Sequence, residues 1–120
     1  MSELCKCRVR WNGRTERRTH PRRAVLPTVT CAVKVRSNEV LSPATIINVS
    51  VGGIRLSTCK RLGPGDPALV ELRNPVSGFA RLKLTRITHT LQTADGECLA
   101  GGAFANELSV EESRALFGAA

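Results

Sequence analysis

Regular alternation of apolar and polar residues marks residues 28–36 as a β-strand. In a strand, residues two apart share a face, so this spacing predicts one face in a core and the other toward water. The residues predicted to face inward are Val29, Cys31, Val33 and Val35. Pro27 precedes the run and Ser37-Asn38-Glu39 follows it, a composition typical of turns.

Five further runs of strand-like composition follow, most of them separated by turns rich in glycine and proline. We expect these strands at residues 44–49, 54–57, 68–73, 79–91 and 97–105. In the run at 54–57, Ile54 and Leu56 should face the core, and Arg55 should face outside, near Asn48. The Gly101-Gly102 pair in the last run predicts tight curvature or close approach of another segment.

The run at 79–91 changes phase along its length. Leu82 and Leu84 fall on one face of the strand, whereas Ile87, His89 and Leu91 fall on the other. One inserted residue near positions 85–86, a β-bulge, would place all five on a continuous inner face, as barrels often require.

Six short strands joined by short turns, all neighbours in sequence, predict an all-β fold, a six-stranded antiparallel β-barrel. A short C-terminal helix should follow over residues 110–117, because Ser109 and Glu112 form the spacing of a capping box. We expect Val110, Leu116 and Phe117 to close an open end of the barrel.

The chain of 120 residues has the size of one domain, and its net charge of +8 is unevenly distributed. Residues 1–23 contain eight arginines and lysines against two carboxylates, so this end carries +6 and the rest of the chain only +2. We therefore expect a flexible basic N-terminal arm over residues 1–16 and a folded domain over residues 17–120.

Five cysteines, an odd number, and a first segment without the apolar core of a signal peptide argue against a disulfide framework. Because no apolar run reaches the roughly 18 residues of a membrane span, we expect a cytoplasmic protein with no membrane partner. Cys31 and Cys98 lie among apolar strand residues and should be buried. Cys5-x-Cys7 has no second close-spaced pair, so no metal site is expected.

The motif Asn48-x-Ser50-x-x-Gly53 lies at the junction of the second and third predicted strands. Asn48 and Ser50, two residues apart, should project together. The apolar residues that alternate with them should point into the core: Ile47, Val49 and Val51. Gly52 and Gly53 predict a tight turn, or a place where a ligand approaches bare backbone. The motif alone leaves a ligand platform and an ordinary β-turn both open.

Upstream, Arg18 and Arg22 form an R-x-x-x-R pair that encloses Pro21. Proline lacks a backbone N–H and does not fit the middle of a helix, so both arginines should lie on a loop. This pair, followed by one predicted strand and then by the N-x-S-x-x-G motif, resembles the signature of the PilZ domain family. The resemblance covers residues 17–117 and implies a small β-barrel that binds the second messenger cyclic di-GMP.

The resemblance also implies a role for each matched residue. Arg18 and Arg22 would bind the ligand phosphates and reach a guanine edge, since the planar guanidinium donates two hydrogen bonds at once. Asn48 would pair with a guanine edge through its amide. Ser50 and the backbone around Gly52-Gly53 would complete the pocket by hydrogen bonds.

Two details of the motif bear on affinity and stoichiometry. Many family members have Asp where this chain has Asn48, and the amide keeps an acceptor but exchanges a charge for a donor. Arg17, directly before the motif, matches family members that bind an intercalated pair of cyclic di-GMP molecules. The resemblance thus implies a ligand dimer.

The sequence contains no recognisable catalytic constellation. Ser50 has no predictable histidine and acid partner, and the chain has neither a P-loop nor a carboxylate cluster for Mg²⁺. We therefore expect a receptor rather than an enzyme, with no cofactor. In this hypothesis the ligand draws the arginine loop onto the barrel and creates a surface for a partner protein.

Two other functions remain open from the sequence. One is a degenerate PilZ adaptor that makes protein contacts only. The other is a small basic β-barrel that binds nucleic acid, which the high charge favours. Three phenylalanines, one tryptophan and no tyrosine are too few for an aromatic stacking platform, so nucleic acid is the weaker alternative.

Overall fold

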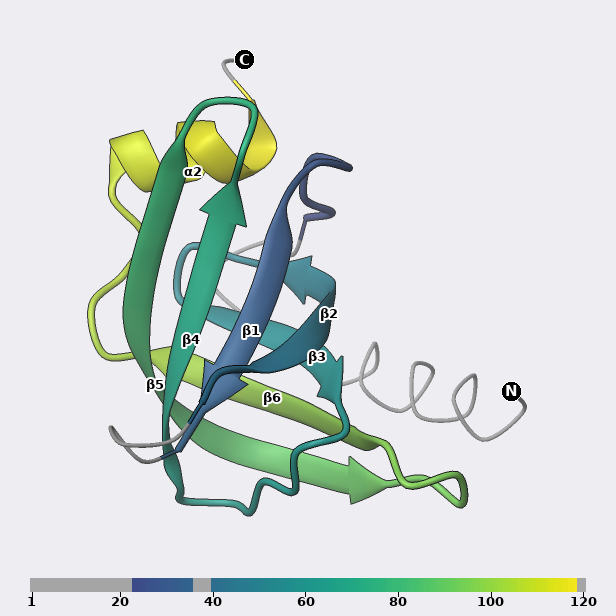
Figure 1. Cartoon of the computed structure of the whole chain (residues 1–120). Coiled ribbons are helices and arrows are strands. Elements are labelled where there is room, and N and C mark those ends of the chain that lie inside the picture. The colour runs from purple at the N-terminus through teal and green to yellow at the C-terminus, as the bar shows by residue number, and fades with distance from the viewer. Residues whose placement is uncertain (1–22, 36–39, 119–120) are drawn as a thin grey trace.

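The structure, a computed structural model, describes residues 23–35 and 40–118 (Figure 1). Several predictions concern residues outside these ranges. They are the flexible arm over 1–16, the cysteine pair Cys5 and Cys7, and the positions of Arg17, Arg18 and Arg22.

The described chain forms an antiparallel β-barrel followed by one short helix (Figure 1). The elements are β1 (Thr30–Lys34), β2 (Ser42–Val49), β3 (Gly53–Thr58), β4 (Pro67–Asn74), β5 (Phe79–Gln92), β6 (Cys98–Phe104) and α2 (Val110–Phe117). The barrel is closed in the order β1-β2-β3-β6-β5-β4. The predicted fold class, a six-stranded antiparallel barrel with a short C-terminal helix, is therefore confirmed.

The strand order differs from the prediction in one respect. Consecutive strands pair within two groups, β1-β2-β3 and β4-β5-β6, but β3 and β4 are not neighbours. Instead β3 pairs with β6, and β4 pairs with β1, so the connection over residues 59–66 crosses from one group to the other. This order places β5 opposite β2 and β4 opposite β3 in the ring.

Apolar side chains that alternate along the strands fill the barrel. Those with at most 1% of their surface exposed include Val33, Val49, Ile54, Leu56, Val70, Leu72, Ile87 and Leu116. Cys31 and Cys98 are buried with them, as predicted. Burial, with a smaller contribution from the charge of Glu71, raises the pKa of the Cys31 thiol to about 12. This thiol therefore stays protonated and behaves as a small apolar side chain.

A β-bulge in β2 corrects the predicted inward set of this strand. The pairing with β3 shifts between Ile46 and Asn48, so the residue between them, Ile47, is the extra one. Ile46 rather than Ile47 packs against the core, while Val49 is fully buried as predicted. Val51, also predicted to point inward, lies beyond the end of β2 and is only partly buried.

A second bulge, in β5, lies further along the strand than predicted. The pairing with β6 shifts between Ile87 and His89, not at residues 85–86. Before the bulge the inward residues are Lys83, Thr85 and Ile87. Leu82 and Leu84, predicted to face the core, are instead 52% and 50% exposed on the outer face, and His89 is exposed as well.

The helix α2 begins with the predicted capping box. The Ser109 hydroxyl accepts a hydrogen bond from the Glu112 N–H, and the Glu112 carboxylate accepts one from the Ser109 N–H. Leu116 is fully buried and Phe117 packs against the core, as expected. Val110 is 71% exposed, contrary to prediction, because it lies two residues from Glu112 and thus on the far side of the helix. No helix of the described ranges is long and apolar enough to cross a membrane.

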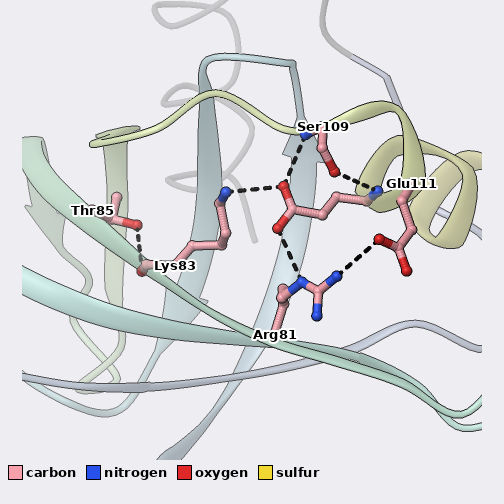
Figure 2. Close-up of polar contacts among 6 residues, drawn as sticks. Arg81, Lys83, Thr85, Ser109 and Glu111 are labelled. Carbon is pink, nitrogen blue, oxygen red and sulfur yellow. Dashed lines mark hydrogen bonds and ion pairs between the residues drawn. The ribbon is translucent and has the colours of Figure 1, made fainter.

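Glu112 also connects α2 to β5 through ion pairs with Arg81 and Lys83, two residues of β5 that Figure 2 labels. Lys83 Nζ lies 3.0 Å from one carboxylate oxygen, and Arg81 Nε lies 3.3 Å from the other. The side chains of Lys83 and Glu112 are each only 9% exposed. Burial by itself would raise the pKa of Glu112, but the hydrogen bonds from the Ser109 backbone, Lys83 and Arg81 outweigh it and lower that pKa. The inward-facing lysine of β5 is therefore neutralised by the helix.

We expect Glu112→Gln to destabilise the fold at neutral pH by about 1–2 kcal/mol. Removing one partner of a fully buried pair costs about 3–5 kcal/mol, and the residual exposure of both side chains reduces this. Because the folded-state pKa of Glu112 lies below its ordinary value of 4.5, its contribution is present above about pH 4.5 and is lost as pH falls further. Denaturant unfolding at several pH values should show the two proteins converging in acid. A constant difference down to pH 3 would contradict this assignment.

Candidate functional site

The N-x-S-x-x-G motif forms a tight hairpin between β2 and β3. The Ser50 N–H donates to the Gly53 carbonyl at 2.9 Å, and the Gly53 N–H donates to the Ser50 carbonyl at 3.4 Å. This reciprocal pair closes a loop of two residues, Val51 and Gly52, so the predicted tight turn is confirmed.

Both loop residues are held by the neighbouring strand β6 and by the segment that follows it. The Gly52 carbonyl accepts a hydrogen bond from the Phe104 N–H, and the Val51 carbonyl accepts one from the Leu108 N–H, each at 2.9 Å. The end of β6 and the segment that follows it therefore fix the orientation of this hairpin. A ligand at the motif would meet a pre-shaped backbone.

Gly53 is required by packing against β6. A Cβ atom at this position would lie 2.4 Å from the Gly102 carbonyl oxygen, far inside van der Waals contact. Gly102 is constrained in the same way, since a Cβ there would lie 2.6 Å from the Arg86 carbonyl oxygen. Neither Gly52 nor Gly53 has a positive φ angle, so backbone conformation does not explain them. The predicted close approach at Gly102 is thus confirmed. The same contact explains why the last position of the N-x-S-x-x-G motif is a glycine.

The two polar side chains of the motif differ in exposure. Asn48 is partly buried, and it is paired across the strands with Arg55. Ser50 has only 2% of its surface exposed. Arg55 lies beside Asn48, as predicted, but it too is only 2% exposed. The motif is therefore covered more closely than an open surface platform would be.

The strand pairing places Asn48 and Arg55 in a row that continues over the neighbouring strands β6 and β5. Arg55 of β3 pairs with Gly101 of β6, and Gly101 pairs with His89 of β5. Asn48, Arg55 and His89 therefore lie in one row, with Gly101 leaving a position without a side chain between the last two. The proximity of Arg55 to Asn48 was predicted, but the extension of the row to Gly101 and His89 was not, because it depends on the β3–β6 pairing and on the bulge before His89.

The residue directly after the arginine motif is tied to the middle of the N-x-S-x-x-G motif. The Arg23 N–H donates to the Val49 carbonyl at 2.7 Å, and the Val49 N–H donates to the Arg23 carbonyl at 2.9 Å. Val49 lies between Asn48 and Ser50 in the chain. The two halves of the sequence signature are therefore joined by a pair of backbone hydrogen bonds.

The segment from Arg23 onward is also anchored on α2. The Arg23 guanidinium lies 4.3 Å from the centroid of the Phe117 ring, a cation–π contact. The Leu26 N–H donates to the Leu116 carbonyl at 2.8 Å. Sequence reasoning assigned no role to Arg23, since neither contact follows from local pattern. Both contacts hold the start of the described chain against α2, whereas the Arg23–Val49 hydrogen bonds hold it beside β2.

The described residues contain no group of three or more His, Cys, Asp or Glu side chains arranged to hold a metal ion. The donors that this region offers are amides, guanidinium groups and backbone N–H groups. Such groups suit an anion or the polar edge of a base rather than a cation.

Comparison with known proteins places the chain in a family. Residues 16–118 match the PilZ domain. The chain also resembles a solved structure, the inhibitor of motility MotI/DgrA of Bacillus subtilis, with a TM-score of 0.59 and 15% sequence identity. That similarity covers 83% of this chain and 48% of the other, so this chain spans about half the length of that protein. At 15% sequence identity, the similarity between the two structures shows a shared fold and nothing more. Among curated proteins, no significant match is found.

Proposed function

The chain belongs to the PilZ domain family, and on this premise we propose that it is a receptor and adaptor for cyclic di-GMP. The observation that carries the proposal is the two-bond bridge between Arg23 and Val49. It brings the chain that follows R-x-x-x-R to the centre of N-x-S-x-x-G. A site composed of both motifs requires this proximity.

Covalent geometry limits how far the arginines can lie from the bridge. Arg22 directly precedes Arg23, and Arg18 precedes it by five residues. Even a fully extended chain spans at most about 3.6 Å per residue, so the Arg18 Cα atom lies within about 18 Å of the Arg23 Cα atom. Both guanidinium groups can therefore reach a ligand that lies on Asn48.

The proposed binding roles are those that membership of the family implies. Arg18 and Arg22 bind phosphate oxygens and guanine edges, and Arg17 supports a second, intercalated ligand molecule. The Asn48 amide pairs with a guanine edge, with the charge of the neighbouring Arg55 raising the local positive potential. Ser50 and the Gly52 backbone complete the pocket. Gly53 contributes by allowing the hairpin to pack on β6.

The proposed response is an ordering of the arginine-bearing segment. The ligand phosphates neutralise the clustered positive charges of residues 17–23 and hold this segment against β2. The segment and the bound ligand then present a surface that the free protein lacks, and a partner protein binds to this surface. Binding is not followed by turnover.

We expect cyclic di-GMP to raise the melting temperature of the protein in a concentration-dependent way. A ligand that binds only the folded state adds about 1.4 kcal/mol for each tenfold rise in concentration above Kd. For a domain of this size that corresponds to a shift of roughly 4–7 °C per decade in a thermal unfolding experiment.

GTP is the control, because it offers a guanine and phosphates in a linear molecule. An equal shift with GTP, or none with cyclic di-GMP at millimolar concentration, would count against the receptor and in favour of an adaptor that makes protein contacts only.

A further inference from the structure

The outer face of β4 and β5 exposes leucines that the sequence pattern assigns to the core. Leu82 and Leu84 are about half exposed. Leu69 of β4 pairs directly with Leu84 and therefore lies on the same face. Meanwhile Lys83 and Thr85 occupy the inward positions of the same strand. Contiguous exposed apolar side chains in a soluble domain mark sites of interaction.

Positively charged side chains border these leucines. Arg86 follows Leu84 on the outer face of β5, and Arg73 lies further along β4. Lys34 of β1 pairs with Leu69. The carboxylate on this face is Glu71, which pairs across the strands with Leu82 and lies 3.9 Å from Arg73. Cations thus outnumber carboxylates around the leucines.

A pocket lies next to Leu84, between the start of β4 and the end of β6. Its volume is about 340 Å³, and its walls include Pro67, Leu84, Ala103, Phe104 and Ala105. Arg86 also lines it, which places a cation at a mainly apolar cavity. A protruding apolar side chain next to a carboxylate would satisfy both features at once.

We propose that Leu69, Leu82, Leu84 and Arg86, here called the leucine face, form a docking surface for an acidic amphipathic segment of a partner protein. An apolar side chain of that segment enters the pocket beside Leu84. A neighbouring carboxylate pairs with Arg86, and Arg73 and Lys34 add to the positive potential around it. Burial of the leucines supplies affinity, and the charges select the partner.

An acidic partner explains the face better than a second copy of the chain or a lipid surface. Two copies would bring Arg86 and its neighbouring cations of each chain together around the leucines, so that like charges would meet. A bilayer is flat and would leave the pocket unfilled. An acidic protein segment complements the charge and also supplies a side chain of the right shape.

Leu69 and Leu82 lie on β4 and β5, which are opposite β3 and β2 in the closed order. Arg86 and the pocket lie nearer the proposed ligand site, because Ala103 of β6 pairs with both Arg86 and Gly53. The leucine face and the ligand site have no residue in common. The inference does not depend on cyclic di-GMP, and a failure of either proposal leaves the other standing.

The test uses two fluorescent helical peptides with the same leucine stripe, one with glutamates and the other with lysines at the polar positions. Fluorescence anisotropy with the full chain should show the glutamate peptide binding at least tenfold more tightly. Leu84→Asp should weaken this binding at least tenfold, whereas Val110→Asp, at an exposed apolar position on α2, should leave it unchanged. Arg86→Glu should reverse the preference toward the lysine peptide.

Several results would overturn the inference. These are no binding of the glutamate peptide, equal binding of both peptides, or equal effects of Leu84→Asp and Val110→Asp. Sedimentation of the wild type as a dimer that Leu84→Asp disperses would identify a second copy as the occupant. Preferential binding to phosphatidylglycerol vesicles would identify a lipid surface. Circular dichroism spectra of the variants, matched to wild type, exclude misfolding as the cause.

Discussion

Gly53→Ala is expected to destabilise the protein by about 2–3 kcal/mol. The added Cβ atom would lie 2.4 Å from the Gly102 carbonyl oxygen, and both partners are backbone atoms of paired strands. Relief of the clash requires β3 and β6 to separate, and over-packing of this kind costs about 1–3 kcal/mol. Thermal unfolding should show a melting temperature lower by roughly 10 °C or more.

Gly63→Ala provides the matched control. A Cβ atom at Gly63 would lie 3.4 Å from the flexible Asp66 carboxylate, and this glycine also has no positive φ angle. We expect its stability to stay within about 0.5 kcal/mol of wild type. If Gly53→Ala matched this control in stability but bound ligand poorly, the glycine would serve the ligand rather than the packing of the barrel, contrary to our assignment.

Arg22→Ala is expected to weaken cyclic di-GMP binding by about 100-fold. Hydrogen bonds to charged groups contribute about 1.5–3 kcal/mol each, and a guanidinium on a phosphate makes two. Because Arg22 directly precedes the Arg23–Val49 bridge, its side chain starts within reach of Asn48. Calorimetric titration with cyclic di-GMP measures the change in Kd and also the number of ligands bound per chain.

Arg61→Ala removes the same charge from an exposed position past the far end of β3, a strand that runs roughly 17 Å away from Gly53, and serves as the control. Its affinity should stay within about twofold of wild type, since an exposed charge at this distance is largely screened by salt. Equal losses in both variants would indicate that net charge, and not the arginine motif, governs binding.

The local sequence pattern was sufficient to predict the positions of the strands and of the helix. Alternation located all six strands to within a few residues, and the Ser109–Glu112 spacing located the start of α2. These features depend on contacts between residues close in sequence. The pairing of β3 with β6 depends on closure of the whole barrel, and short-range periodicity carries no information about it.

The orientation of β5 was wrong for an identifiable physical reason. Hydrophobicity places Leu82 and Leu84 inside, but the structure places Lys83 there. A buried lysine is tolerable only with a partner, and that partner, Glu112, lies 29 residues further along the chain. The spacing between Ser109 and Glu112 identified Glu112 as a capping residue. Its second role, as the partner of the buried Lys83, cannot be predicted from local sequence.

The candidate site was likewise only partly predictable. The motif residues and the tight turn followed from the sequence. The contribution of Arg23 did not, because its contacts to Val49 and Phe117 join segments far apart in the chain. The near-complete burial of Ser50 and Arg55 also depends on tertiary packing.

The most direct test of the central claim is an NMR titration of the ¹⁵N-labelled full chain with cyclic di-GMP. We expect saturable shifts in the amide signals of Arg23 and of Asn48 to Gly53, together with those of residues 17–20 and Arg22, and little change at Leu82 and Leu84. Absence of shifts at millimolar ligand, or shifts confined to β4 and β5, would contradict the proposal that this hairpin and the arginine motif form a cyclic di-GMP site.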